Sequence, residues 1–207
     1  MRAALRALGE TSVTAGLILM LFCAYLLWGT GAYTQSQQLL LQRELEAAKA
    51  AGERGRLDRI DLGRAVALLG IPRLGPGYRY AIVEGVGADQ LRKGPGHYPG
   101  SALPGQVGNF VVSGHRTTYA APFNRLDELE RGDEIVVDAR EARYTYRVTS
   151  QDVVEPDEVD VLAPVPGKPD IRPIRAYITL STCHPEFSAA QRLIVYGVLK
   201  ETQLRKE

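Results

Sequence analysis

The N-terminal part of the chain contains no charged side chain between Thr11 and Gln42, and this segment restricts the fold more than any other. Residues 13–28 within it are nearly all apolar, and residues 11–33 together reach the roughly 20 residues that a helix needs to cross a bilayer core. A cleaved signal peptide is the alternative, but its apolar region usually covers only about 7–15 residues. The sequence therefore predicts one uncleaved transmembrane helix at residues 11–33.

The residues that flank this apolar segment predict its orientation. Arg2 and Arg6 precede it, and positive charge is retained on the cytoplasmic side of a membrane. Aromatic residues of the kind found at a membrane interface gather toward its far end, at Tyr25, Trp28 and Tyr33. We expect a single-pass protein of the cell membrane, with residues 1–10 in the cytoplasm and residues 35–207 outside.

Residues 34–61 are expected to form a stalk between the membrane and a folded domain. Residues 35–54 are rich in helix-forming residues and contain no proline, which predicts a helix. Its apolar residues form only a narrow stripe, made of Leu41, Leu45 and Ala48. We therefore expect a solvated helix, with a flexible linker as the alternative. The folded domain is expected at residues 62–200, followed by a short tail at 201–207.

The rest of the chain alternates β-rich runs with turn signals. Most of the 12 prolines and 21 glycines follow residue 50, which favours a turn-rich β domain over a helical bundle. Strands are expected at residues 64–71, 78–83, 110–113, 134–138, 143–154, 176–182 and 193–199, with a hairpin connection at 72–77 and a short helical piece at 123–129. About seven short strands with so little helix predict an all-β domain, a closed or nearly closed barrel. A net charge of +1 gives no basic surplus for binding nucleic acid.

Cys183 has no disulfide partner in its own domain, because the other cysteine, Cys23, lies in the apolar N-terminal segment and is expected to face lipid or a core. Cys183 ends one predicted strand and His115 follows another, so a barrel can bring both to the same rim. A nearby imidazolium or guanidinium stabilises a thiolate. His115, Cys183 and Arg192 therefore supply an acid/base, a nucleophile and a cation for the oxyanion of a tetrahedral intermediate.

Each of these residues also has an alternative interpretation. Cys183 could be a buried structural thiol, and Arg192 could be an ordinary edge-strand cation. Two other histidines are rival bases: His97 lies in a turn rich in glycine and proline, and the side chain of His184 is expected on the face opposite to that of Cys183. His115 is favoured because Ser-Gly-His directly follows a predicted strand.

Three sequence blocks resemble the sortases, cysteine transpeptidases of Gram-positive bacteria, and more narrowly the class E sortases of actinobacteria. The blocks are residues 94–101 (GPGHYPGS), 108–119 (GNFVVSGHRTTY) and 179–188 (TLSTCHPEFS), with Arg192 in the next strand. The resemblance covers residues 62–200 and the anchor. It implies a closed sortase-type β-barrel of about eight strands with short helices, preceded by one transmembrane helix.

The resemblance also implies an activity and a set of roles. Cys183 would attack the Thr–Gly bond of a C-terminal sorting signal of the Leu-Ala-x-Thr-Gly or Leu-Pro-x-Thr-Gly type. His115 would protonate the leaving amine, and Arg192 would hold the substrate backbone and stabilise the oxyanion. An amine of a peptidoglycan precursor would then resolve the thioester and attach the surface protein to the cell wall. Thr182 and Tyr98 match positions linked to substrate binding.

No cofactor and no metal site are predicted. Asp157, Glu158 and Asp160 form an acidic cluster near the loop at which some sortases bind calcium, but a solvated acidic loop is expected here. The expected partners are surface proteins bearing a sorting signal, the peptidoglycan precursor and the membrane. Two alternative functions remain, a sortase that joins pilin subunits and a non-catalytic wall-binding barrel.

Overall fold

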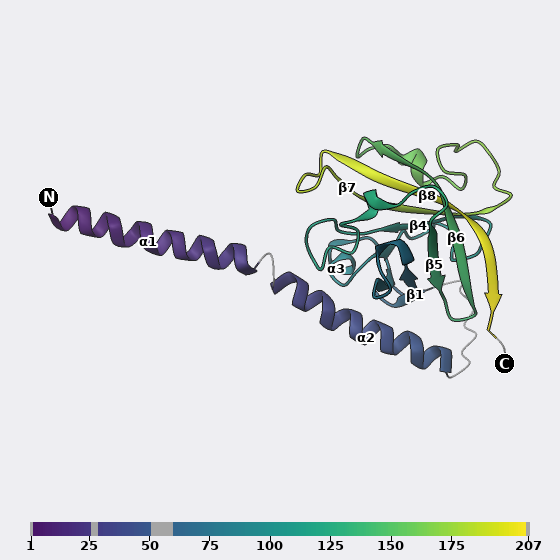
Figure 1. Cartoon of the computed structure of the whole chain (residues 1–207), viewed down its shortest axis with the longest axis horizontal. Coiled ribbons are helices and arrows are strands. Elements are labelled where there is room, and N and C mark those ends of the chain that lie inside the picture. Colours follow the sequence, from purple (N-terminus) through teal and green to yellow (C-terminus); the bar gives the residue numbers. More distant parts are fainter. Residues whose placement is uncertain (1, 26–28, 51–59, 206–207) are drawn as a thin grey trace.

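The computed structural model describes residues 2–25, 29–50 and 60–205, which form a barrel preceded by two long helices (Figure 1). Helix α1 (Arg2–Ala24) extends away from the barrel and buries none of its side chains. Among the described residues it is the one helix long and apolar enough to cross a membrane. The segment expected at 11–33 runs past its end: residues 26–28 lie outside the described part of the chain, and helix α2 (Thr30–Ala50) follows.

The barrel closes through eight strands. In chain order they are β1 (Ala65–Gly70), β2 (Arg79–Glu84), β3 (Gly96–His97), β4 (Gly108–Ser113), β5 (Glu134–Asp138), β6 (Ala142–Val154), β7 (Ala176–His184) and β8 (Gln191–Leu204). Around the barrel the order is β1-β2-β3-β4-β7-β8-β6-β5. The pairs β2–β3 and β4–β7 are parallel and the other pairs are antiparallel. The prediction of a closed β-barrel is confirmed.

Two strands differ from the sequence-based expectation. β3 was not expected, because two residues are too few to show a pattern. β8 continues to Leu204, which lies opposite Ala142 of β6, so strand pairing extends past the boundary expected at residue 200. Short helices occupy several connections, namely η2 (Pro72–Leu74), α3 (Ala88–Leu91), η3 (Leu126–Glu128) and η4 (Val159–Leu162).

The interior of the barrel is an apolar cluster to which alternate residues of the strands contribute. Ile178 and Leu180 of β7 belong to it together with Phe110 and Val112 of β4, and all four are buried. Successive side chains of a strand point to opposite faces of the sheet. The odd-numbered residues of β7, which include Cys183, therefore point to the outer face of the barrel.

Helix α2 lies against the outside of the barrel, which differs from the solvated helix expected within residues 34–61. Leu41 and Leu45 pack on apolar side chains that β1 and β2 present outward. Burying one leucine side chain stabilises a fold by about 1.5–3 kcal/mol, so this cluster favours the docked position of the helix. The apolar stripe of α2 looked narrow in the sequence because its buried face also contains two polar residues, Thr34 and Gln38.

Candidate active site

The parallel register of β4 and β7 brings His115 and Cys183 to the same end of the barrel. Ser113 lies opposite Ser181, and the N–H of Gly114 donates to the carbonyl of Ser181 at 3.1 Å. His115 follows Ser113 by two residues and Cys183 follows Ser181 by two residues. Both residues therefore lie at the same end of the barrel, although they are far apart in the sequence.

Arg192 lies directly opposite Cys183 in the antiparallel pair β7–β8. Directly opposed residues in such a pair share one face of the sheet, so the guanidinium and the thiol both lie on the outer face. The Nη1 atom of Arg192 donates to the carbonyls of Ala189 and Gln191, both at 2.9 Å. Arg192 and Cys183 are thus directly opposed, His115 lies at the same end of the barrel, and the carbonyls of Ala189 and Gln191 hold the guanidinium.

His115 is half-buried and makes a tilted ring contact with Tyr119, with the two ring centroids 4.9 Å apart. The guanidinium carbon of Arg92 lies 6.0 Å from the centroid of the Tyr119 ring. Burial lowers the pKa of His115 because it disfavours the charged ring, and the positive charge of Arg92 lowers this pKa further. The neutral imidazole is therefore favoured at neutral pH.

The loop that follows His115 is strained. Three consecutive residues other than glycine have positive φ, at 53° for Tyr119, 61° for Ala120 and 43° for Ala121. A left-handed conformation of this kind costs about 1–3 kcal/mol per residue and persists only where the surroundings impose it. Two tyrosines supply such restraint: Tyr80 Oη donates to the carbonyl of Ala120 at 3.4 Å, and Tyr78 Oη donates to the carbonyl of Pro122 at 2.6 Å.

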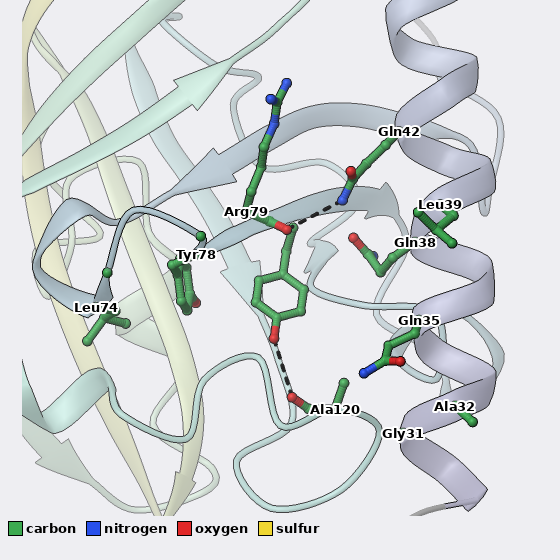
Figure 2. Close-up of a pocket in the computed structure, with 13 residues that line it drawn as sticks. Gly31, Ala32, Gln35, Gln38, Leu39, Gln42, Leu74, Tyr78, Arg79 and Ala120 are labelled. Carbon is green, nitrogen blue, oxygen red and sulfur yellow. Dashed lines mark hydrogen bonds between the residues drawn. The ribbon is translucent and has the colours of Figure 1, made fainter.

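A crevice of about 830 Å³ separates α2 from this loop and from β2 (Figure 2). Figure 2 shows Gln35, Gln38 and Gln42 projecting from α2 toward the barrel, with Ala120 on the opposite wall. Helix α2 and the strained loop after His115 therefore share one cavity.

Arg116, the residue after His115, is a part of the site that the sequence analysis missed. Its side chain is only 6% exposed and reaches the end of β7. There Nη1 donates to the carbonyl of Cys183 at 3.3 Å and to Nδ1 of His184 at 3.1 Å, while Nη2 lies 3.2 Å from a carboxylate oxygen of Asp127. Arg116 therefore joins the loop after β4 to the residue that carries the thiol. A charged residue directly after the Ser-Gly-His block was the available signal.

The two other histidines have hydrogen-bond partners that leave them less suited to act as the base. His97 is 2% exposed and lies in β3, not in the turn expected from the sequence. Its Nδ1 lies 2.6 Å from a carboxylate oxygen of Glu84, and its Nε2 lies 2.8 Å from the hydroxyl of Ser101. Because an arginine N–H can only donate, Nδ1 of His184 accepts the hydrogen bond from Arg116. His115 is therefore the candidate base.

Thr182 faces the opposite side of β7 from Cys183. Its side chain is 3% exposed, and its hydroxyl donates to the carbonyl of Gly114 at 2.8 Å. This placement differs from the direct substrate contact implied by the resemblance, because alternation along the strand turns the side chain inward. The hydroxyl instead fastens β7 to the residue that precedes His115.

Tyr98 lies further along the outer face of the barrel. It is 38% exposed, and its N–H donates to the carbonyl of Val111 at 2.9 Å. Val111 is paired with Thr179, four residues before Cys183 in β7. Four residues of extended strand span about 13 Å, so Tyr98 does not touch the three residues at the end of the barrel. It lines a separate hollow of about 600 Å³.

Asn109 lines this hollow and binds the segment that forms another part of its wall. Its Nδ2 donates to the carbonyls of Val161 and Ala163, at 3.0 and 3.1 Å, and its Oδ1 accepts a hydrogen bond from the hydroxyl of Thr179 at 2.8 Å. These bonds tie the segment that contains η4 to both β4 and β7. The signal in the sequence was a lone amide in an otherwise apolar strand.

Comparison with known proteins places the chain in a family. The model of the Sortase domain matches residues 69–200. Sortase SrtE1 of Streptomyces coelicolor is 35% identical over 210 residues, which cover 98% of this chain and 59% of that protein. Sortase E from Streptomyces avermitilis has a TM-score of 0.64 and 40% identity, covering 70% of this chain and 93% of that chain. Sortase E1 from Streptomyces coelicolor, with a tripeptide in its active site, has a TM-score of 0.63 and 39% identity, covering 69% and 92%.

The fold and the site together define a class of protein, a closed β-barrel that carries a candidate cysteine nucleophile at one end, opposite an arginine. The matches are more specific than this class. The chain belongs to the sortase family, and it is similar to the class E sortases of Streptomyces. The resemblance noted in the sequence is confirmed. The chain spans about 59% of the length of SrtE1.

Proposed function

We propose that this protein is a membrane-anchored transpeptidase that cleaves a C-terminal sorting signal between threonine and glycine and transfers the new carboxyl end to an amine of the peptidoglycan precursor. The observation that supports the proposal is the strand pairing that sets Arg192 opposite Cys183 at the end of the barrel where β4 leads into His115. Membership of the sortase family supports the same reaction.

In the first step the neutral imidazole of His115 takes the proton of the Cys183 thiol, and the sulfur forms a bond to the threonine carbonyl carbon of the signal. The negative charge then falls on the carbonyl oxygen, and Arg192 stabilises it, since its other guanidinium N–H groups remain when Nη1 is bound to loop carbonyls. As the C–N bond breaks, His115 gives a proton to the glycine amine. A thioester of the surface protein with Cys183 remains.

In the second step an amine of the wall precursor attacks the thioester carbonyl. His115 accepts the proton that the amine loses, and the sulfur of Cys183 leaves as the C–S bond breaks. The neutral imidazole favoured by its surroundings is the form that this step requires. One histidine therefore serves as the acid in the first step and as the base in the second.

The outer face of β4 and β7 offers a track for the signal peptide. The hollow beside Tyr98 lies four residues along β7 from Cys183, or about 13 Å, which matches four extended residues ending in the threonine of a Leu-Ala-x-Thr segment. We assign Tyr98 to contact with the first residues of that segment. The tripeptide in the active site of Sortase E1 supports peptide binding on this fold.

The proposed anchor is α1, with the N-terminus in the cytoplasm and the barrel outside. Its length and hydropathy fit one crossing, and Arg2 and Arg6 lie at its N-terminal end. Protease added to intact protoplasts is expected to degrade the barrel. If the barrel is protected until the membrane is permeabilised, the orientation is the opposite of the one proposed.

The reaction can be tested with the full chain in detergent micelles. A fluorogenic Leu-Ala-x-Thr-Gly peptide is expected to be cleaved at the Thr–Gly bond, and an added amine acceptor is expected to appear in the product by mass spectrometry. Cys183→Ala should abolish both products and the covalent acyl-enzyme. Cys23→Ser is the matched control, because it removes the other thiol and should leave turnover unchanged. Cleavage that persists in Cys183→Ala would disprove the proposed nucleophile.

A further inference from the structure

Helix α2 holds the backbone of the segment between α3 and β3. Thr34 Oγ1 donates to the carbonyl of Arg92 at 2.8 Å, and Gln38 Nε2 donates to the carbonyl of Lys93 at 2.8 Å. Both side chains are buried, and the two bonds are partly buried. A Cβ on Gly94 would collide with the Gln38 amide, which shows how closely the helix approaches this segment.

The side-chain amide of Gln38 also pairs with both backbone groups of one residue in β2, as the backbone of a neighbouring strand would. Its Oε1 accepts the N–H of Ala81 at 2.6 Å, and its Nε2 donates to the carbonyl of Ala81 at 3.0 Å. Figure 2 shows Gln38 and Gln42 directed from α2 toward the barrel. One side chain therefore fixes α2 to β2 and to the segment that carries Arg92 at the same time.

The side chain of Arg92 reaches from this segment toward the acid/base histidine. Its guanidinium lies over the Tyr119 ring, and that ring contacts His115, at the distances given above. Tyr119 belongs to the strained loop with positive φ, so its ring position depends on what surrounds it. The ion pair of Arg92 with Asp89 is exposed and 3.4 Å long, and such pairs contribute little.

We infer that Arg92 is a positioning residue for His115 and that α2 sets Arg92 in place through Thr34 and Gln38, so that the docked juxtamembrane helix is part of the active site. The inference rests on the proposed function only for the acid/base role of His115. If α2 served only as a stalk, its side chains would make no hydrogen bonds to the segment that carries Arg92, and it would not affect the position of His115.

Two effects of Arg92 on His115 are separable. The planar guanidinium restrains the Tyr119 ring, and a cation–π contact of this kind corresponds to a factor of about 2–5 in an equilibrium. Its charge disfavours the imidazolium form of His115. The charged and titratable groups near His115 include Arg92 on the segment after α3, Tyr119 on its own loop and Arg116, which directly follows it and binds the carbonyl of Cys183. Cys183 on β7 and the opposed Arg192 on β8 lie at the same end of the barrel.

The test uses the full chain in micelles and two readouts. The first is an NMR titration of the His115 ring, assigned with His115→Gln, which needs no substrate. Arg92→Gln is expected to move this titration to higher pH because it removes a like charge, whereas Arg92→Lys should keep it near the wild-type position. The second is peptide cleavage, where Arg92→Gln and Thr34→Val are each expected to lower kcat about 2–5-fold with little change in KM.

Arg147→Gln is the matched control, since that arginine forms an exposed pair with Glu134 at 3.8 Å on the β5–β6 side of the barrel. It should change neither readout. An unshifted His115 titration in Arg92→Gln overturns the role of Arg92. A wild-type kcat in Thr34→Val overturns the role of α2. If the wild type does not cleave the peptide while the titration shifts in Arg92→Gln, the proposed function is wrong and the positioning of His115 by Arg92 stands.

Discussion

Thr182→Val separates a structural role of this threonine from the substrate contact that the family resemblance implies. The substitution keeps the shape of the side chain and removes the hydrogen bond from Thr182 Oγ1 to the carbonyl of Gly114, which measures 2.8 Å. Because the site is buried, the carbonyl loses its partner without gaining water. The loss of such a bond, with its acceptor left unpaired, is expected to cost about 1–2 kcal/mol of unfolding free energy.

That cost should lower Tm by about 2–8 °C in a chain of this size. Gly114 directly precedes His115, so kcat should also fall, by about 3–10-fold, because misplacing a catalytic group by a fraction of an ångström reduces its effective concentration. KM should change little. Thermal unfolding by circular dichroism and steady-state cleavage of the signal peptide measure the two quantities, with the exposed Thr202→Val as control. A raised KM at unchanged Tm would refute this reasoning and restore direct substrate contact.

Three further outcomes are expected. Arg192→Lys should raise the barrier to peptide cleavage by about 2–4 kcal/mol, because lysine cannot reproduce the planar fork of donors; near-normal turnover would leave Arg192 a structural role only. Leu45→Ala should destabilise the docked α2 by about 2–4 kcal/mol, since Leu45 is 0% exposed, whereas Leu39→Ala on the exposed face of the same helix should have almost no effect on thermal unfolding. The pKa of His115 is lower in the folded state than in the unfolded chain, so the unfolded chain binds more protons as the pH falls below about 7 and stability should decrease. Urea titrations at several pH values should show this slope reduced in His115→Gln, and an identical slope would contradict the lowered pKa.

The sequence was sufficient for features that depend on local patterns. An uncharged apolar run predicted the N-terminal helix, and β-rich runs separated by glycine and proline predicted the barrel strands. The pattern around Cys183 identified the family, because the residues that carry the chemistry lie at strand ends within short, specific blocks. The position of Cys183 on the face opposite to that of His184 followed from strand alternation alone.

Tertiary structure decided which distant groups meet. The register of β4 against β7 brings His115 and Cys183 to the same end of the barrel, and no local pattern fixes the register between strands so far apart in the chain. The docking of α2 was missed because its buried stripe includes Thr34 and Gln38, whose hydrogen bonds are made to another part of the chain and give no apolar signal. Periodicity reports the burial of a residue along its own element, whereas the partners of a buried polar group depend on the packing of the whole fold.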